Sequence, residues 1–234
     1  MNRRTRIGMG SNKEIRLGAA IFNADHGRLA DEVKRIEAAG LDFIHLDVFD
    51  GHFVQDLGFP PRTIASLRRL TPLSFEVHLG ALKPERFIPK IAEAGADVVI
   101  PHIESISTTY EIIDEVRSYG LKAGLAFTMG TPLICLEPVI GLIDSVLLLS
   151  RGIGESNRRE TAFSYLALPR IRYARSLAEA SKVKMDIQVA GGVKIQHVKD
   201  IVSSGATSIA LGGTLYKASD MRAEVEKIRS LLDP

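Results

Sequence analysis

Residues 29–48 read Leu-Ala-Asp-Glu-Val-Lys-Arg-Ile-Glu-Ala-Ala-Gly-Leu-Asp-Phe-Ile-His-Leu-Asp-Val, a stretch that contains a helix, a stop and a strand. Leu29, Val33 and Ile36 fall on one face of a helix, and charged residues occupy the other face. The glycine after this run suits the left-handed backbone that ends many helices. The apolar residues that follow, some of them β-branched, predict a strand over 43–48.

This helix–glycine–strand unit recurs along the chain. The phrase Ala-Ala-Gly-Leu-Asp at 38–42 returns as Glu-Ala-Gly-Ala-Asp at 93–97 and as Ser-Ser-Gly-Ala-Thr at 203–207. Short apolar runs predict eight strands, at 16–22, 43–48, 73–79, 97–102, 122–127, 145–150, 186–190 and 208–211. Helical spacing predicts a helix after each strand, at 28–39, 61–70, 84–94, 109–119, 133–140, 161–181, 195–203 and 221–232.

Eight strand–helix units predict an α/β fold, a single-domain (β/α)8 TIM barrel. A doubly wound open sheet is the alternative, but it usually has fewer strands, and no Gly-x-Gly-x-x-Gly phrase follows the first strand. We expect residues 15–234 to form the barrel and residues 1–14 to form a basic N-terminal extension. That extension lacks the apolar segment of a secretory signal.

The composition narrows the classes of function. The chain has 234 residues, of which 45% are hydrophobic and 25% charged, as in ordinary globular proteins. A net charge of +2 is too small to predict nucleic-acid binding. No run of 18 uncharged apolar residues is present, so no transmembrane helix is expected. The single cysteine, Cys135, excludes an internal disulfide, and we expect a cytoplasmic protein.

Polar side chains gather on two neighbouring predicted strands. His45 and Asp47 are two positions apart, so both point to the same side of their strand, and Glu76 and His78 do so on the next one. The residues between them are apolar and belong under the helices, which places the polar side chains in the barrel lumen. Two imidazoles and a carboxylate match the ligand set of a divalent metal; buried polar residues that satisfy one another are the alternative interpretation.

Glycines follow three consecutive predicted strands. Gly154 comes after the sixth, Gly191 and Gly192 after the seventh, and Gly212 and Gly213 after the eighth. Loops after strands seven and eight are the usual phosphate site of phosphate-handling barrels, and glycine lets backbone N–H groups approach an anion closely. Tight turns favour glycine too, but three such turns in succession predict phosphate binding.

Several stretches together resemble the ribulose-phosphate 3-epimerase family, namely 17–25, 45–54, 76–79, 101–104 and Gly191-Gly192. The string His-Leu-Asp-Val-Phe-Asp-Gly-His-Phe-Val at 45–54 is the most specific of them. The resemblance implies a barrel that converts ribulose 5-phosphate to xylulose 5-phosphate through an enediolate. It also implies a divalent metal (Zn, Fe, Mn or Mg) and two aspartates that exchange the proton at C3.

The resemblance assigns roles to particular residues. It implies that His45, Asp47 and His78 hold the metal and that Asp47 is one of the two acid–base aspartates. The phosphate would bind at the glycine turns, with Gly191, Gly192, Gly212, Gly213 and Gly154. The substrate pocket would include Ala20, Asn23, Phe49, His102, Glu104 and Ala190.

One departure from the family pattern bears on the chemistry. Ala190 stands in Ala-Gly-Gly where the family has Asp-Gly-Gly, and that aspartate would be both a fourth metal ligand and the second acid–base group. Alanine neither ligates a metal nor moves a proton. We therefore expect a metal site that is weak or empty and a degenerate second acid–base position. Glu155, after the sixth strand, is a candidate replacement for the missing acid.

The favoured interpretation is a ketose-phosphate 3-epimerase-like isomerase of carbohydrate metabolism that acts on a phosphorylated sugar. A non-catalytic sugar-phosphate-binding homologue is one alternative. A hexulose-phosphate synthase-like aldolase is another, but Phe49 stands where that enzyme's Asp-x-Lys-x-x-Asp string has its lysine. The resemblance further implies a homo-oligomer, either a dimer or a hexamer, and neither nucleic acid nor a membrane is expected as a partner.

Overall fold

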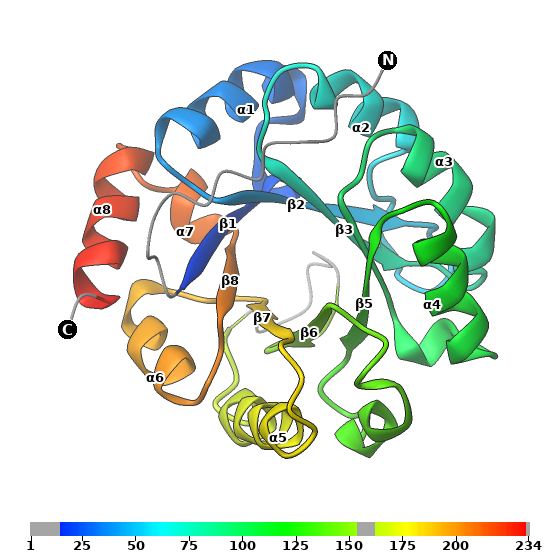
Figure 1. Cartoon of the computed structure of the whole chain (residues 1–234). Helices are drawn as coiled ribbons and strands as arrows, with labels where there is room; N and C mark the ends of the chain where they lie inside the picture. Colours follow the sequence, from blue (N-terminus) through cyan, green and yellow to red (C-terminus); the bar gives the residue numbers. More distant parts are fainter. Residues whose placement is uncertain (1–14, 154–161, 233–234) are drawn as a thin grey trace.

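The computed structural model describes residues 15–153 and 162–232, and these form a (β/α)8 barrel (Figure 1). Its parallel strands close in the order β1 to β8, with β1 paired to β8. The strands are β1 Arg16–Ala20, β2 Phe43–Phe49, β3 Ser74–Gly80, β4 Val98–Pro101, β5 Lys122–Phe127, β6 Ser145–Leu149, β7 Asp186–Ala190 and β8 Ser208–Leu211. The predicted barrel is therefore confirmed. The predicted extension at 1–14 lies outside the described residues and stays a prediction.

Helices form the outer layer around the strands (Figure 1). The α-helices are α1 Leu29–Ala38, α2 Pro61–Arg68, α3 Ile88–Glu93, α4 Thr109–Ser118, α5 Ala167–Ala180, α6 Val198–Ser203, α7 Gly213–Tyr216 and α8 Met221–Leu232. Short 3-10 helices lie between them, η1 Ile21–Asn23, η2 His26–Arg28, η3 Pro84–Arg86, η4 Ile103–Ser105, η5 Leu133–Val139 and η6 Ile195–His197. In the part of the chain that the structure describes, no helix is long and apolar enough to cross a membrane.

Two of the predicted helices differ in the structure. The stretch predicted at 133–140 is a 3-10 helix, because Pro138 lies inside it and lacks the N–H that an α-helix would use. The helix predicted to begin at residue 161 begins at Ala167. The segment just before α5 is held along the end of β6 instead, since the Ser164 N–H donates to the Ser150 carbonyl at 2.8 Å.

Glycines end the helices as the repeated phrase predicts. Gly40, Gly95 and Gly205 adopt φ values of 76°, 94° and 107°, a left-handed region in which a side chain would be strained. Each helix stop leads directly into the next strand, so the chain returns to the barrel within a few residues. On α1, Val33 and Ile36 are fully buried against the strands, as their helical spacing predicts.

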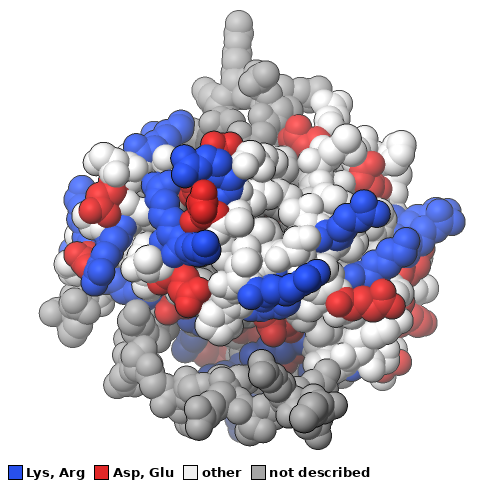
Figure 2. All heavy atoms as spheres, turned by 90° about the horizontal axis from the view of Figure 1, so that it is seen from above, with Lys and Arg blue, Asp and Glu red and all other residues white. Residues whose placement is uncertain are grey.

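The surface carries charges of both signs. On the face shown in Figure 2, Lys and Arg side chains lie beside Asp and Glu side chains. This mixture agrees with the net charge of +2. A protein that tracks a phosphate backbone usually carries a stripe of one sign, and this face does not present one.

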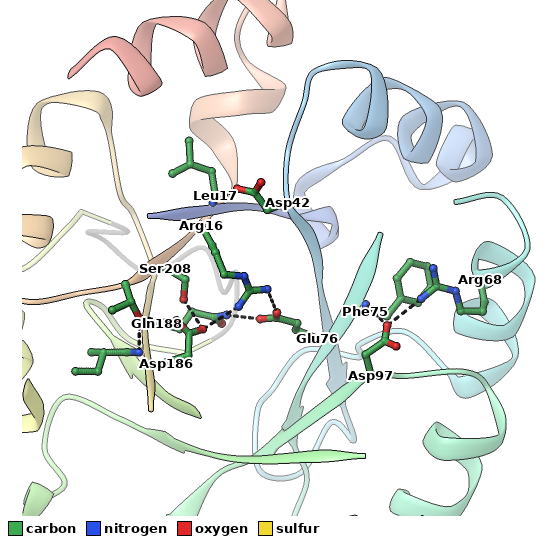
Figure 3. A network of polar contacts seen from close by, with 12 residues as sticks. Arg16, Leu17, Asp42, Arg68, Phe75, Glu76, Asp97, Asp186, Gln188 and Ser208 are labelled. Atoms are coloured by element: carbon green, nitrogen blue, oxygen red, sulfur yellow. Dashed lines mark hydrogen bonds and ion pairs between the residues drawn. The ribbon is translucent and has the colours of Figure 1, made fainter. Parts of the chain in front are cut away.

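A polar network fills the part of the lumen near the start of strands β1 and β7. Arg16 on β1 lies between Glu76 on β3 and Asp186 on β7 (Figure 3), and its guanidinium contacts Asp186 at 3.0 Å and also pairs with Glu76. Gln188 donates to Glu76 at 2.5 Å, and Ser208 donates to Asp186 at 2.8 Å. Burial raises the pKa of Glu76, and the Arg16 charge counteracts that effect. The network therefore ties strands from both ends of the chain together.

The first prediction concerns this network. Arg16→Met keeps the length of the side chain but leaves the Glu76 carboxylate, 2% exposed, without its cation. Breaking a buried ion pair usually lowers the free energy of unfolding by about 3–5 kcal/mol. Because 37% of the Arg16 side chain is exposed, we expect urea unfolding to show a smaller decrease, of about 2–3 kcal/mol. Arg222→Met is the matched control, since Arg222 pairs with Glu226 in solvent. Equal effects of the two substitutions would contradict a structural role for the network.

Candidate functional site

Strands β2 and β3 bring three polar side chains together inside the barrel. Asp47 is in register with His78, and His45 lies two residues earlier on β2. Ile44 and Leu46, on either side of His45 in the sequence, pack in the outer core between strands and helices. His45 and His78 are 2% exposed and Asp47 is 9% exposed. The alternation in the sequence therefore predicts the side of the strand correctly for each of them.

The three side chains form a compact set of donor atoms. His78 Nδ1 lies 2.8 Å and His45 Nε2 lies 3.5 Å from Asp47 Oδ1. One ligand atom from each residue lies within 4.8 Å of the others, and His45 Nδ1 is buried without a hydrogen-bond partner among the described residues. Catalytic metal sites use three such protein ligands and keep a position open. The residues present therefore fit a divalent cation.

The electrostatics of the cluster favour one anionic and one neutral ligand. Burial would raise the pKa of Asp47, but the neighbouring His45 charge and the hydrogen bonds of His45 and His78 lower it well below its usual range. Burial lowers the pKa of His78 to about 4, so its imidazole is neutral near pH 7. Burial would also lower the pKa of His45, yet the Asp47 carboxylate raises it. An ionised carboxylate and a neutral imidazole are the forms that bind metals.

A cavity of about 790 Å³ opens beside the cluster. Its walls include every described residue that the sequence assigns to the metal and the phosphate, and four of the residues assigned to the pocket, namely Ala20, Asn23, Phe49 and Ala190. His102 and Glu104 are not among the lining residues, and their predicted place in the pocket stays a prediction. His102 Nε2 contacts His78 Nε2 at 2.7 Å, and His102 Nδ1 contacts Glu104 Oε2 at 2.8 Å.

The cavity has a polar and an apolar side. Ala190 belongs to a second buried apolar cluster with Leu149 and Ala210, and Ile153 packs against that cluster. All four line the cavity, across the barrel from the imidazoles. The described lining residues include two carboxylates, Asp47 and Glu224. Position 190 is an alanine, so it supplies no second acid.

Glycine turns form the rim of the same cavity. Gly191 and Gly192 adopt φ values of 104° and 66°, and Gly212 and Gly213 lie at the start of α7. Gly154 and Glu155 lie outside the described residues, so their predicted roles stay predictions. The sequence interpretation did not single out Lys194 and Lys217, which also line the cavity. Their signal is a basic residue shortly after each glycine pair, which suits an anionic ligand.

Asp50, which follows β2 in the most specific string, has a structural role. Its carboxylate accepts hydrogen bonds from the backbone N–H groups of His52 and Phe53, both at 2.9 Å, and of Leu82 at 2.8 Å. These bonds shape the turn after β2 and tie it to the loop after β3, as expected for an aspartate before a glycine. They lower the pKa of Asp50 against the effect of burial.

The fold and the cluster define a class of protein, a (β/α)8 barrel with a buried His-Asp-His set beside a glycine-rimmed cavity. The sequence matches the model of the Ribulose-phosphate 3 epimerase family over residues 16–216. The chain therefore belongs to this family of isomerases, as its resemblance predicts.

Curated relatives and solved structures support the assignment at different levels. Ribulose-phosphate 3-epimerase of Bacillus subtilis is 33% identical, over 92% of this chain and 98% of its own length. The chloroplastic ribulose-5-phosphate-3-epimerase of Arabidopsis thaliana is 31% identical, over 98% of this chain and 82% of its own. A 3-hexulose-6-phosphate synthase structure aligns with a TM-score of 0.67 at 20% identity, covering 92% of this chain and 99% of its own, which shows the fold alone.

The second prediction concerns the glycine rim. A ketose phosphate should stabilise the protein in a thermal-shift assay, by roughly 2.7 kcal/mol at 100 times its dissociation constant. Gly213→Asp should abolish the shift, because it places a carboxylate at the rim that would repel the phosphate. The new side chain fits, since the nearest atom to a Cβ at this position is Lys217 Cε at 3.8 Å. Gly141→Asp, in an open position away from the cavity, is the control. A shift that survives in Gly213→Asp would place the phosphate elsewhere.

Proposed function

We propose that this chain is a ketose-phosphate 3-epimerase-like enzyme that acts on ribulose 5-phosphate and xylulose 5-phosphate or on a related sugar phosphate. The observation that carries the proposal is the Asp47 carboxylate, buried between two imidazoles at the wall of a cavity whose opposite rim suits a phosphate. Membership of the epimerase family and relatives named ribulose-phosphate 3-epimerase support it.

The residues divide the work between binding and proton transfer. The backbone around Gly192 and Gly213, with Lys194 and Lys217, would hold the phosphate and so fix the distance of the sugar carbons from Asp47. The Asp47 carboxylate would then take the proton from C3. The electron pair of the broken C3–H bond forms the C2–C3 double bond, and the C2 carbonyl oxygen becomes the enediolate oxygen.

A divalent cation, whether Zn, Fe, Mn or Mg, would be held by His45, Asp47 and His78. When bound, it supplies Lewis-acid stabilisation for negative charge on the substrate oxygens. Asp47 would serve both as a ligand and as the proton acceptor. With Ala190 in place of a fourth ligand, we expect the cation to be held weakly.

Inversion at C3 requires a proton returned to the opposite face. Ala190, Leu149 and Ala210 line the cavity across from the imidazoles, so these three positions offer no acid. We therefore propose a degenerate second acid–base position and a low rate of inversion. The same apolar wall favours the second candidate function, a homologue that binds a sugar phosphate without turning it over. A cytoplasmic location and a dimeric or hexameric assembly remain part of the proposal.

The third prediction separates an enzyme from a binder. Incubation of a ketose phosphate with the protein in deuterated water should incorporate deuterium at C3, because Asp47 exchanges its proton with solvent between removal and return. Asp47→Asn should lower the exchange rate by about 10²–10⁴, the usual contribution of one acid–base group. Asp50→Asn is the control, since Asp50 serves a turn outside the cavity lining. Exchange that persists in Asp47→Asn would assign the proton transfer to another group.

The fourth prediction concerns Ala190. Ala190→Asp adds a ligand and an acid on the apolar side of the cavity, so it should tighten metal binding and raise the rate of C3 inversion by about 10²–10⁴. Ala210→Asp is the matched control, because Ala210 is in the same buried cluster and pairs with Ala190 in register. Rapid inversion by the wild type, with no gain in Ala190→Asp, would show that another group already supplies the second proton.

A further inference from the structure

A chain of four side chains runs from the His-Asp-His cluster to the loop after β5. Asp47 Oδ1 lies 2.8 Å from His78 Nδ1, and His78 Nε2 lies 2.7 Å from His102 Nε2. His102 Nδ1 lies 2.8 Å from Glu104 Oε2. His102 is fully buried, and neither it nor Glu104 is among the residues that line the cavity.

The outer end of the chain is held as an ionised carboxylate. Glu104 Oε1 accepts hydrogen bonds from the backbone N–H of Thr128 at 2.8 Å and from its hydroxyl at 2.9 Å, and also from the hydroxyl of Thr131. Arg170 donates to the carbonyls of both threonines and so fixes this loop. An ionised carboxylate only accepts hydrogen bonds, so the contact with His102 requires that His102 donates.

Counting donors and acceptors fixes the protons of both imidazoles once a cation lies between His78 Nδ1 and Asp47. With its Nδ1 lone pair on the cation, the His78 ring carries its proton on Nε2 and donates it to His102 Nε2, which is bare because His102 donates to Glu104 from Nδ1. The neutral His78 ring is left with a bare Nδ1, which faces the Asp47 carboxylate at 2.8 Å. Two acceptors this close require a positive ion between them, either a proton or a metal ion.

We propose that His102 and Glu104 are positioning residues that keep His78 in the tautomer with Nε2 protonated, so that its Nδ1 lone pair points to a divalent cation shared with Asp47. The inference rests on the metal-assisted proton transfer proposed above. Glu104 thereby acts on the cation through two imidazoles without touching it. Metal-binding histidines generally donate their second N–H to such a partner, and loss of the partner weakens metal affinity by about 10–100-fold.

The experiment is a calorimetric titration of the whole chain with Zn²⁺. Glu104→Gln keeps the shape of the side chain, but its amide can donate to His102 and so reverse the chain, which places the proton on His78 Nδ1. We expect Zn²⁺ to bind about 10–100-fold more weakly to Glu104→Gln. Thr131→Val is the matched control, because it removes a hydrogen bond to Glu104 and leaves the contact with His102, and it should bind Zn²⁺ as the wild type does. Circular dichroism checks that both variants fold.

A second measurement observes the tautomers directly. In the Zn²⁺-loaded wild type with ¹⁵N-labelled histidine, imidazole spectra should show the proton of His78 on Nε2 and that of His102 on Nδ1. A proton on His78 Nδ1, an unchanged Zn²⁺ affinity in Glu104→Gln, an equal loss in Thr131→Val, or a wild type that binds no Zn²⁺ would each overturn the inference. None of these measurements needs turnover. If the wild type exchanges deuterium but Glu104→Gln binds Zn²⁺ with unchanged affinity, only this inference is contradicted. If the tautomers are as expected but no exchange occurs, only the proposed function is contradicted.

Discussion

The burial of one carboxylate inside the barrel governs the arrangement of the site. An ionised group as enclosed as Asp47 is unfavourable unless it is paired and hydrogen-bonded. His45 and His78 provide the pairing, but each imidazole is itself buried and requires partners in turn. His102 meets that requirement for His78, and Glu104 meets it for His102 at the protein surface. A single buried charge thus accounts for the chain of polar side chains that runs from Asp47 to Glu104.

The lumen is divided into regions of different polarity, and each has a separate consequence. The polar network around Arg16 pairs its charges within itself, through Glu76 and Asp186, and joins the first strand to the third and the seventh. Elsewhere in the lumen, the imidazoles on β2 and β3 contact the Asp47 carboxylate, while Ala190 and its neighbours on β6 to β8 make the opposite wall apolar. In the proposed function, chemistry on a bound sugar is supported from one side of the cavity, and the glycine rim holds the phosphate in place.

The sequence predicts the local features well, because they depend on local periodicity. Alternation along one strand places His45 and Asp47 in the lumen, and the helix-ending glycines locate the strand starts. Long-range contacts are different. The pairing of Arg16 with Asp186, which lie 170 positions apart, exists only because the barrel closes. The contact of His102 with His78 depends on the stagger between β3 and β4, which a single sequence does not specify, so the sequence does not predict this contact.

A crystal structure of the protein with a ketose phosphate bound would show both ends of the ligand at once. We expect the phosphate against the backbone of Gly192 and Gly213. We also expect C3 within about 3.5 Å of an Asp47 oxygen, the separation at which reacting groups meet, with its other face toward Ala190. A phosphate bound away from the glycine rim, or a C3 atom out of reach of Asp47, would show that Asp47 is not the group that takes the proton from C3.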